Sequence, residues 1–571
     1  MKGTTVAMDV VHLETDILVI GSGAAGMMAA LEASKDGASV ILADRSLIGR
    51  SGATIMAQMT VAVALGSQTP DSWEHHLADT LAAGRELCDV SLAQLVCEEG
   101  PRDILQLDAW KVGWARNDDG SIRQALAPGH DRPRCVYVDF LSTGPAVAKT
   151  LRGRVLRQKE VTRIGDLYIT DILVTDGVAT GAAGFSLADG RPVAVKAKAV
   201  VIATGGLTRL YQRNSASANM GGDGYALALR AGAELTDMEF VQFFPIGHLA
   251  PRLVGMDPIM WDPFRYKLGG RLLNAEMREF VNDYGNEEAG TYNVTRDRAT
   301  FAILSEVKAG RGTPAGGAYL SFQHIPAETL RASFGPVIDR LAANGIDLTQ
   351  MPIEVAPIAH YHMGGVKVDA QMRTCVPGLF SCGEANGGAN GANRLSGNAI
   401  TEAFVFGRTA GRTAALHASA AGNANAPVPA GALDLVAAVT PDGGEIHAGL
   451  IAELQQTMAV NVGPFRTEEG LRTALTAIAD LKARLGTLPP GTPGPYNMAR
   501  LDWFDLRSML LVAEAVTRSA LVRKESRGAH QRNDFPAMDP AFVLHHTVKL
   551  AGDDIVLARA PVEGRTLCEV A

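Results

Sequence analysis

The stretch Thr15–Asp44, TDILVIGSGAAGMMAALEASKDGASVILAD, decides the fold of this chain. Asp16–Ile20 is an apolar run without polar alternation, which is typical of a strand buried on both faces. It leads into Gly21–Gly26, a G-x-G-x-x-G pattern whose glycines permit a tight turn and close approach to a pyrophosphate. A small-residue helix (27–35) and a second apolar strand follow, and that strand ends in Asp44, where an acid can hold ribose hydroxyls. The order of these elements predicts a dinucleotide site rather than a glycine-rich turn in an ordinary α/β domain.

The length and composition indicate a globular enzyme-sized chain of two or three domains. It has 571 residues, of which 47% are hydrophobic and 20% charged, and its net charge is −8. This charge argues against a general nucleic-acid or membrane-surface role. No segment reaches the roughly 18 uninterrupted apolar residues that a membrane span needs, and residues 1–10 are too short for a signal peptide.

The six cysteines are scattered, with no C-x-x-C pair; they are Cys88, Cys97, Cys135, Cys375, Cys382 and Cys568. This spacing argues against a metal or iron–sulfur site within the chain. It also favours a reducing, cytoplasmic location over a disulfide framework.

Further segments suit the edge of a parallel sheet, where ligands bind in doubly wound folds. A buried strand at 199–203 runs into Thr204-Gly205-Gly206, and a short strand at 379–382 runs into Gly383-Glu384. MGGDG at 220–224 opens a helix with Asp223 at the expected N-cap, a position that alone would explain an aspartate. The loop 45–58 is either a simple connection or a loop lying against the cofactor, since small residues and hydroxyls suit a flat ring.

The rest of the chain divides by pattern. Residues 71–115 have helical periodicity, 166–203 read as a β-meander, 444–530 are strongly helical and 541–562 alternate like a hairpin. Aromatics and prolines change the pattern between 237 and 352, which indicates an inserted domain. We therefore predict a dinucleotide-binding domain at 1–236 and 353–432, an inserted second domain at 237–352, a helical domain at 433–540 and a small β segment at 541–571.

Several spaced motifs resemble the flavoprotein subunits of succinate dehydrogenase and fumarate reductase, together with L-aspartate oxidase. The resemblance covers nearly the full length. The motifs are Ile20–Gly26 (IGSGAAG), Ala203–Gly206 (ATGG), Gly222–Gly224 (GDG), Glu239–Phe243 (EFVQF), Arg296–Asp297 (RD), His360–Gly365 (HYHMGG), Gly391–Asn398 (GANRLSGN) and Arg523–His530 (RKESRGAH).

The resemblance implies an α/β fold: a Rossmann-like FAD-binding domain, an inserted α+β capping domain over the flavin and a C-terminal helical domain. It implies FAD as cofactor, with substrate between the two domains reacting at flavin N5. The predicted cofactor-binding residues are Gly21, Ser22, Gly23, Ala24, Ala25, Gly26, Asp44, Arg45, Ser51, Thr54, Ala203, Thr204, Gly205, Asp223, Glu384 and Asn398.

The resemblance also assigns roles to three polar residues. Arg394 matches the arginine that binds the substrate carboxylate, a task suited to a bidentate guanidinium; alternatively, it holds the flavin's phosphate or a domain contact. His360 matches a substrate-binding histidine, or is a satisfied core histidine. Arg296 matches the arginine that relays a proton, or forms a surface ion pair. Arg527 and His530 either join the site or only tie the helical domain to the cap.

The chain departs from the family pattern at four places. The histidine that binds flavin covalently falls at Ala53, so FAD is expected to be non-covalent. The H-P-T after the F-V-Q-F motif becomes Phe244-Pro245-Ile246. The glutamate-bearing T-E-x-x-R-G-E-G-G stretch is replaced by 262–270 (DPFRYKLGG), and the histidine before G-A-N-R-L is Asn390.

These changes remove polar groups that hold the distal carboxylate of a four-carbon diacid and add apolar ones: Phe244, Leu268 and, in one interpretation, Trp261. A site built for hydrogen bonds discriminates strongly against a ligand that lacks them. We therefore expect a monocarboxylate or a bulkier, partly apolar acid, with His362, His248 or Lys267 as replacements for the lost histidine. The predicted catalytic set is Arg296, His360, Arg394, His362 and Phe244.

Two other functions remain open at this point. One is a conventional succinate dehydrogenase, fumarate reductase or L-aspartate oxidase. The other is an electron-transfer flavin subunit with a degenerate pocket, which the presence of the three polar residues argues against. The electron partner is equally open, with a ferredoxin, a quinone, dioxygen or an iron–sulfur subunit as alternatives, and no metal site is predicted.

Overall fold

The computed structural model describes residues 4–5, 9–58, 60–139, 141–253, 259–261, 268–284, 296–421, 427–441 and 444–562; of these, the side chains of 4–5, 296–298, 334 and 336 are not described. Its centre is a seven-stranded sheet in the order β7-β3-β2-β10-β9-β8, with β17 paired to β10. The strands are β2 (Val11–Ile20), β3 (Val40–Ala43), β7 (Val161–Ile164), β8 (Leu167–Thr175), β9 (Val178–Ser186), β10 (Pro192–Ile202) and β17 (Leu379–Ser381).

Four of the parallel strands, β3, β2, β10 and β17, end at one edge of this sheet. Ile20 at the end of β2 pairs with Ala43 on one side and Ile202 on the other, and Ile202 pairs with Ser381. The four predicted loops that follow these strands therefore lie side by side, as the carboxyl ends of parallel strands must. The meander is antiparallel, through β8, β9 and β10.

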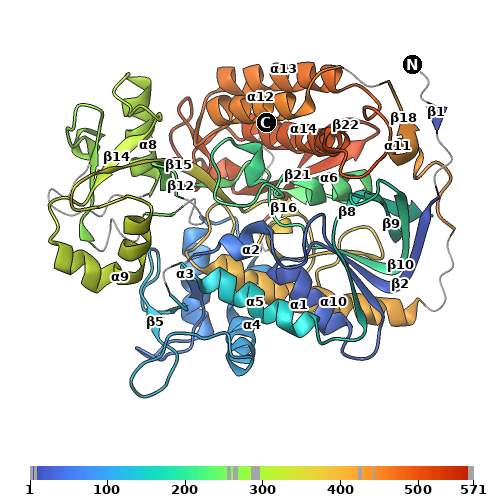
Figure 1. The fold of residues 1–571 in the computed structure, drawn as a ribbon, viewed down its shortest axis with the longest axis horizontal. Helices are drawn as coiled ribbons and strands as arrows, with labels where there is room; N and C mark the ends of the chain where they lie inside the picture. The colour runs from blue at the N-terminus through green and yellow to red at the C-terminus, as the bar shows by residue number, and fades with distance from the viewer. Residues whose placement is uncertain are drawn as a thin grey trace.

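Helices α1, α5 and α10 pack together beside the sheet (Figure 1). Their bounds are α1 (Ala24–Ala33), α5 (Thr143–Val155) and α10 (Asn398–Ala420). The peripheral helices predicted from 71–115 are α3 (Trp73–Ala83) and α4 (Val90–Ala109), and α4 packs on α10. The short β4 (Val61–Ala62), β5 (Gln124–Ala125) and β6 (Cys135–Val136) form a separate three-stranded sheet.

The capping segment projects to one side of the molecule, at the left of Figure 1. Its sheet has the order β12-β15-β14-β13, built from β12 (Val241–Ala250), β13 (Arg271–Leu273), β14 (Ala318–Ser321) and β15 (Ile353–His362), with helices α8 (Arg296–Lys308) and α9 (Ala327–Ala343). It has its own hydrophobic core, which includes Trp261, Leu320 and Val355. The sheet continues through β15, ten residues past the predicted boundary at 352, because β15 returns beside β12.

The C-terminal region forms a helical layer and a small sheet. Helices α12 (His447–Asn461), α13 (Glu468–Leu485) and α14 (Met498–Val522) pack on one another, and α14 also packs on α6 (Asp223–Arg230). The predicted hairpin is β21 (Leu544–Ala551) and β22 (Asp554–Pro561). It joins β11 (Leu235–Thr236) and β16 (Gly365–Val366), so the chain end is tied to the base of the capping segment.

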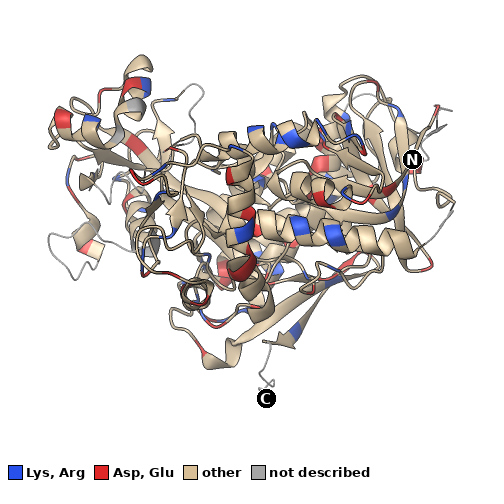
Figure 2. Ribbon diagram, turned by 90° about the horizontal axis from the view of Figure 1, so that it is seen from below, with Lys and Arg blue, Asp and Glu red and all other residues tan. Residues whose placement is uncertain are grey.

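The remaining short elements connect these layers. They are β1 (Thr4–Thr5), α2 (Gly52–Met56), η1 (Thr208–Leu210), η2 (Val281–Tyr284), η3 (Gly383–Ala385), α11 (Asp434–Ala437), β18 (Ala438–Val439), β19 (Phe465–Arg466), β20 (Gln531–Arg532) and η4 (Pro540–Phe542). Among the described helices, none is long and apolar enough to cross a membrane. Acidic and basic positions are mixed along the helices in Figure 2.

Candidate flavin and substrate site

A cavity of about 860 Å³ opens at the carboxyl edge of the central sheet. One part is lined by the loops that follow β2, β3, β10 and β17, together with β8 and the start of α6. The other part is lined by α2, the loop 123–130, Phe244 and Met260 of the capping segment, and the segments around His360 and Arg394. The cavity thus has a nucleotide end on the sheet and a substrate end under the cap.

The glycine loop forms the floor of the nucleotide end. Gly21 has φ +104°, a value that favours glycine, and a Cβ there would lie 2.4 Å from the Ala203 carbonyl oxygen. Gly26 lies behind the loop, where a Cβ would meet the Gly21 carbonyl oxygen at 1.8 Å. Helix α1 begins directly after Gly23, and Gly23, Ala24 and Ala25 line the cavity, so the N-terminus of this helix suits a pyrophosphate.

Asp44 ties this loop to the segment that follows β3. One carboxylate oxygen accepts hydrogen bonds from the backbone amide and hydroxyl of Ser22, at 2.9 and 2.5 Å. The other accepts from the amide and hydroxyl of Ser46, at 2.8 and 2.9 Å. These four donors fill the acceptor positions of a carboxylate, so ribose hydroxyls would have to compete for the predicted contact.

Asp223 offers the free hydrogen-bond acceptor for a ribose hydroxyl that Asp44, already bonded to Ser22 and Ser46, does not. It lines the cavity as the first residue of α6, after Gly222 at the N-cap, which corrects the prediction that Asp223 is itself the N-cap. Its Oδ1 atom is buried without a hydrogen-bond partner, as is the Thr204 hydroxyl beside it in the cavity wall. Burial raises the pKa of Asp223 to about 6. Unpartnered polar atoms facing a cavity fit a bound polar ligand, since buried polar groups are otherwise paired.

These features fit FAD. The glycine loop and the start of α1 suit the pyrophosphate, and Asp223 suits ribose hydroxyls. Glu384 lies deep in the cavity next to Cys382, where burial raises the pKa of its carboxyl to about 8. Thr54 of α2 accepts a hydrogen bond from the Ala24 amide at 2.9 Å, so the loop after β3 closes over the glycine loop. Arg45, Ser51 and Ala53 line the same cavity.

Arg394 is the buried cation of the substrate end. It lines the cavity with 5% of its surface exposed, and its guanidinium lies 4.4 Å from the centre of the Tyr361 ring. Its Nη2 donates to Gln242 Oε1 at 3.1 Å, and Gln242 Nε2 donates back to the Arg394 carbonyl at 3.0 Å. Gln242 belongs to β12 of the capping segment, so the cap helps to orient this arginine.

A buried carboxylate, that of Glu402, contacts the Tyr361 side chain on which Arg394 packs. Glu402 on α10 accepts hydrogen bonds from the Tyr361 hydroxyl at 2.8 Å and from Asn390 Nδ2 at 2.6 Å. Burial raises the pKa of Glu402 to about 7. Asn390, which replaces the family's histidine, therefore holds Glu402 and does not line the cavity.

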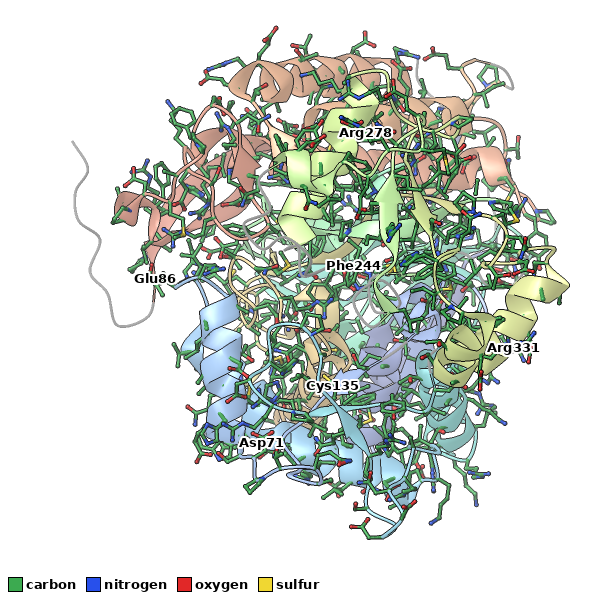
Figure 3. The ribbon with its side chains drawn as sticks, turned by 90° about the vertical axis from the view of Figure 1, so that its left-hand side faces the viewer. Asp71, Glu86, Cys135, Phe244, Arg278 and Arg331 are labelled. Carbon is green, nitrogen blue, oxygen red and sulfur yellow. The ribbon has the colours of Figure 1, made fainter. Side chains whose placement is uncertain are left out.

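The opposite wall of the substrate end is apolar. The Phe244 ring meets the His360 ring edge-on, with centroids 4.2 Å apart and an angle of 76°, and forms a cluster with Met260 and Ile358. His360 is fixed by the Ser215 hydroxyl, 2.7 Å from its Nδ1. Figure 3 labels Phe244 near the middle of the molecule, between the yellow-green capping segment and the blue N-terminal elements. The wall therefore combines one imidazole with a hydrophobic surface.

Two models of protein families match the chain: an FAD-binding domain at residues 16–400, and the C-terminal region of fumarate reductase flavoproteins at 451–570. One component of the CoM/CoB fumarate reductase of Methanothermobacter marburgensis is 36% identical over 92% of this chain and 95% of that protein. The chain belongs to the succinate dehydrogenase and fumarate reductase flavoprotein family. It is therefore an FAD-dependent oxidoreductase.

Solved structures of the family share the whole fold. Mycobacterium smegmatis Sdh1, in complex with UQ1, has a TM-score of 0.88 and 33% identity, covering 97% of this chain and 95% of that one. A mutant of FrdA from the Escherichia coli quinol fumarate reductase has a TM-score of 0.87 and 32% identity, covering 98% of this chain and 99% of that one. The predicted Rossmann-like domain, inserted cap and helical C-terminal domain are thereby confirmed as the family's fold.

Three of the predicted site residues that the structure describes do not line the cavity: Gly26, which lies behind the glycine loop, His362 and Asn398. His362 is fully buried, with Nδ1 3.0 Å from the Tyr225 hydroxyl and Nε2 3.1 Å from the Met238 carbonyl, and this burial lowers the pKa of its ring to about 4. Both ring nitrogens of His362 lie within hydrogen-bond distance of other protein groups. The prediction that His362 contacts the substrate is therefore corrected. Asn398 is also buried, where it bonds to His76 and Thr80, so its predicted contact with the cofactor is corrected too.

The other suggested replacements also lie elsewhere. His248 accepts from the indole of Trp261 at 3.0 Å, and both side chains are buried in the cap without lining the cavity. Leu268 packs against the core of the cap. The segment 262–267, with Lys267, lies outside the described residues, as does the side chain of Arg296, the first residue of α8.

Arg527 and His530 belong to a buried charged network rather than to the cavity wall. Arg527 pairs with Glu525, while His530 Nδ1 lies 2.7 Å from Arg466, which donates to the Glu239 carbonyl at the base of the cap. They therefore tie the helical domain to the cap. Gln242, Tyr361 and Glu402 were not predicted from the sequence, although Gln242 and Tyr361 lie within the EFVQF and HYHMGG motifs.

Proposed function

We propose that this oxidoreductase acts on a C–C (or C–N) bond next to a carboxylate, in an acid other than the standard four-carbon diacids. The observation that carries the proposal is the contact of Phe244 with His360. The resemblance puts a substrate-binding histidine at position 244, where this chain has an aromatic ring backed by Met260 and Ile358. An acid with an apolar substituent beyond its carboxylate suits such a wall.

Each residue of the cavity has its own role in the proposed reaction. When bound, FAD supplies the hydride chemistry at N5. Arg394 holds the substrate carboxylate in a water-poor site, where charge-assisted hydrogen bonds are strong. His360, fixed through Ser215, orients the carbon skeleton, and Phe244 and Met260 exclude water from it. Arg296, by resemblance, relays a proton, and its backbone stands at the start of α8 in the cap.

A panel of acids tests this function. The rate of flavin bleaching or reoxidation is measured anaerobically and in air, with succinate, fumarate and L-aspartate beside crotonate, cinnamate and their saturated forms. We expect the apolar monocarboxylates to react faster than the diacids and Arg394→Ala to abolish the response. Good turnover of succinate, fumarate or L-aspartate would contradict the proposed substrate class and favour a conventional family member.

The same panel tests the electron-transfer alternative. A flavin subunit with a degenerate pocket would show no acid-dependent rate, and its Arg394→Ala variant would behave like the wild type. Buried Arg394, held by Gln242 and Tyr361 from two paired strands of the cap, supports a working carboxylate site instead.

We also propose that FAD is held non-covalently. Ala53 lies in α2 at the cavity wall, and its methyl group offers no atom to bond a flavin. Acid precipitation should release all the FAD into the supernatant, measured by its absorbance. A pellet that stays yellow would overturn this proposal.

For the electron route we propose a separate iron–sulfur protein or ferredoxin, consistent with the absence of a C-x-x-C pair in the sequence. The relative from Methanothermobacter marburgensis is itself named as one subunit of its enzyme. Reduction of the bound flavin by chemically reduced ferredoxin, followed by its absorbance, tests the proposal. A rate no faster than that with ferredoxin omitted would contradict it.

A further inference from the structure

The nucleotide end of the cavity includes an arginine that is held by the helical domain. Arg45 follows Asp44 at the end of β3 and lines the cavity. Its two terminal nitrogens donate to the two carboxylate oxygens of Asp505, each at 2.7 Å. Asp505 lies on α14, 460 residues further along the chain. This bidentate geometry fixes both the position and the plane of the guanidinium.

The Asp505 carboxylate also accepts hydrogen bonds from two further side chains. The Tyr168 hydroxyl donates to it at 3.1 Å and Arg209 Nη1 at 2.6 Å. Although burial alone would raise the pKa of Asp505, the charges and hydrogen bonds of the two arginines lower it below its ordinary value. The Asp505 carboxylate is therefore ionised, and the two arginines compensate its negative charge.

Arg45 is also placed against an aromatic surface. Its guanidinium carbon lies 4.9 Å from the centre of the Tyr168 ring, and Tyr168 lines the cavity beside it. The segment of Arg209 is tied to the helical domain a second time, because Gln455 of α12 donates to the Arg209 carbonyl at 2.7 Å. Two helices of the C-terminal domain thus hold the wall of the nucleotide end.

We propose that the helical domain is part of the cofactor site, with Asp505 as a positioning residue that holds Arg45 at the nucleotide end for FAD. Asp505 itself does not line the cavity and acts through Arg45. Since Asp44 precedes Arg45 at the strand end where dinucleotide folds hold the adenosine ribose, the arginine serves that half of the cofactor. By linkage, binding of FAD and docking of α14 then stabilise each other.

Asp505→Asn tests the proposal, because an amide keeps the shape but presents one NH₂ group to the arginine donors. The dissociation constant of FAD is measured by fluorescence titration of the apoprotein, and retention by ultrafiltration. We expect the dissociation constant to rise at least tenfold. The matched control is Glu514→Gln on the same helix, which disturbs ion pairs with Lys482 and Arg518 away from the cavity lining. It should bind FAD like the wild type.

A double-mutant cycle keeps the test decisive if Asp505→Asn also lowers thermal stability. Arg45→Ala and Arg45→Lys should each weaken FAD binding, the lysine because it lacks the bidentate fork. In the Arg45→Ala background, Asp505→Asn should add less than a threefold further change, because the two residues act as one unit. Independent, multiplicative effects would overturn the proposal, as would a fall in the apoprotein unfolding temperature with unchanged or tighter FAD binding.

Discussion

The two ends of the cavity are built in different ways. At the nucleotide end, the floor comes from short loops that follow parallel strands, and one glycine motif supplies most of it. At the substrate end, Arg394, Gln242 and Tyr361 come from three separate segments, two of which are paired strands of the cap. The difference is that the floor of the cofactor end follows a local motif, whereas the whole substrate end depends on tertiary assembly. Variants at one end should therefore leave the other end's ligand unaffected.

The largest effect is expected for Arg394→Lys, with FAD retained. A lysine keeps the charge but lacks the fork that binds a carboxylate through two hydrogen bonds, and a hydrogen bond to a charged group contributes about 1.5–3 kcal/mol. We expect kcat/KM for the preferred acid to fall at least about 100-fold, measured by steady-state kinetics, while flavin absorbance per protein is unchanged. Arg278→Lys, at an exposed arginine labelled in Figure 3, is the control. Parallel losses of flavin and activity would show that the two ends are not separable.

The converse effect is expected for Asp223→Asn at the nucleotide end. A hydrogen bond to a charged group contributes about 1.5–3 kcal/mol, so its loss should weaken FAD binding by about 10- to 100-fold. Fluorescence titration of the apoprotein measures this. When FAD is saturating, KM for the acid should equal that of the wild type. An unchanged FAD affinity would mean that the unpartnered Asp223 oxygen is not a cofactor contact.

A smaller, selective effect is expected for Phe244→Ala. Removing the ring opens the apolar wall beside His360 and Met260, so the preference for apolar acids over small polar ones should fall about tenfold, within the usual range for pocket contacts. Competition between cinnamate and fumarate measures the ratio. An unchanged ratio, with both rates reduced equally, would show that Phe244 supports His360 without touching the substrate.

The smallest effect concerns pH and Glu402. Burial raises its pKa from 4.5 to about 7. The folded apoprotein is therefore most stabilised by Glu402 below pH 4.5 and loses this contribution as the pH rises through 7. The shift corresponds to about 3 kcal/mol. Glu402→Gln should flatten the decline of the unfolding temperature between pH 5 and 8 by a few degrees, while Glu98→Gln on the surface should not. A steeper decline would contradict the assignment.

Much of the fold followed from local patterns. The strands at 16–20 and 199–203, the β-meander, the helices of 71–115 and 444–530 and the final hairpin all lie where periodicity predicted them, since each buries one face or a whole strand. The inserted capping segment followed from a change in composition. Its sheet, however, extends through β15, because pairing with β12 depends on residues more than 100 positions away.

The site was harder to predict than the fold. His362 and Asn398 lie in the right motifs, but their side chains turn into the protein, where Tyr225 and His76 bind them. A motif gives a backbone position and does not give the direction of every side chain. Asp505 carried no signal in sequence, because its partner Arg45 is 460 residues away.

The sequence by itself determined the dinucleotide site and the domain order, because a glycine loop between a buried strand and a small-residue helix is a local structure. The family and FAD followed from the resemblance of several spaced motifs. It also identified Ala53 and Phe244 as departures from the family pattern. Only the tertiary structure decided how the cavity is walled. Its side-chain pairs form only when distant segments pack, and local sequence does not encode that packing. These pairs are Arg394 with Gln242, Phe244 with His360, and Arg45 with Asp505.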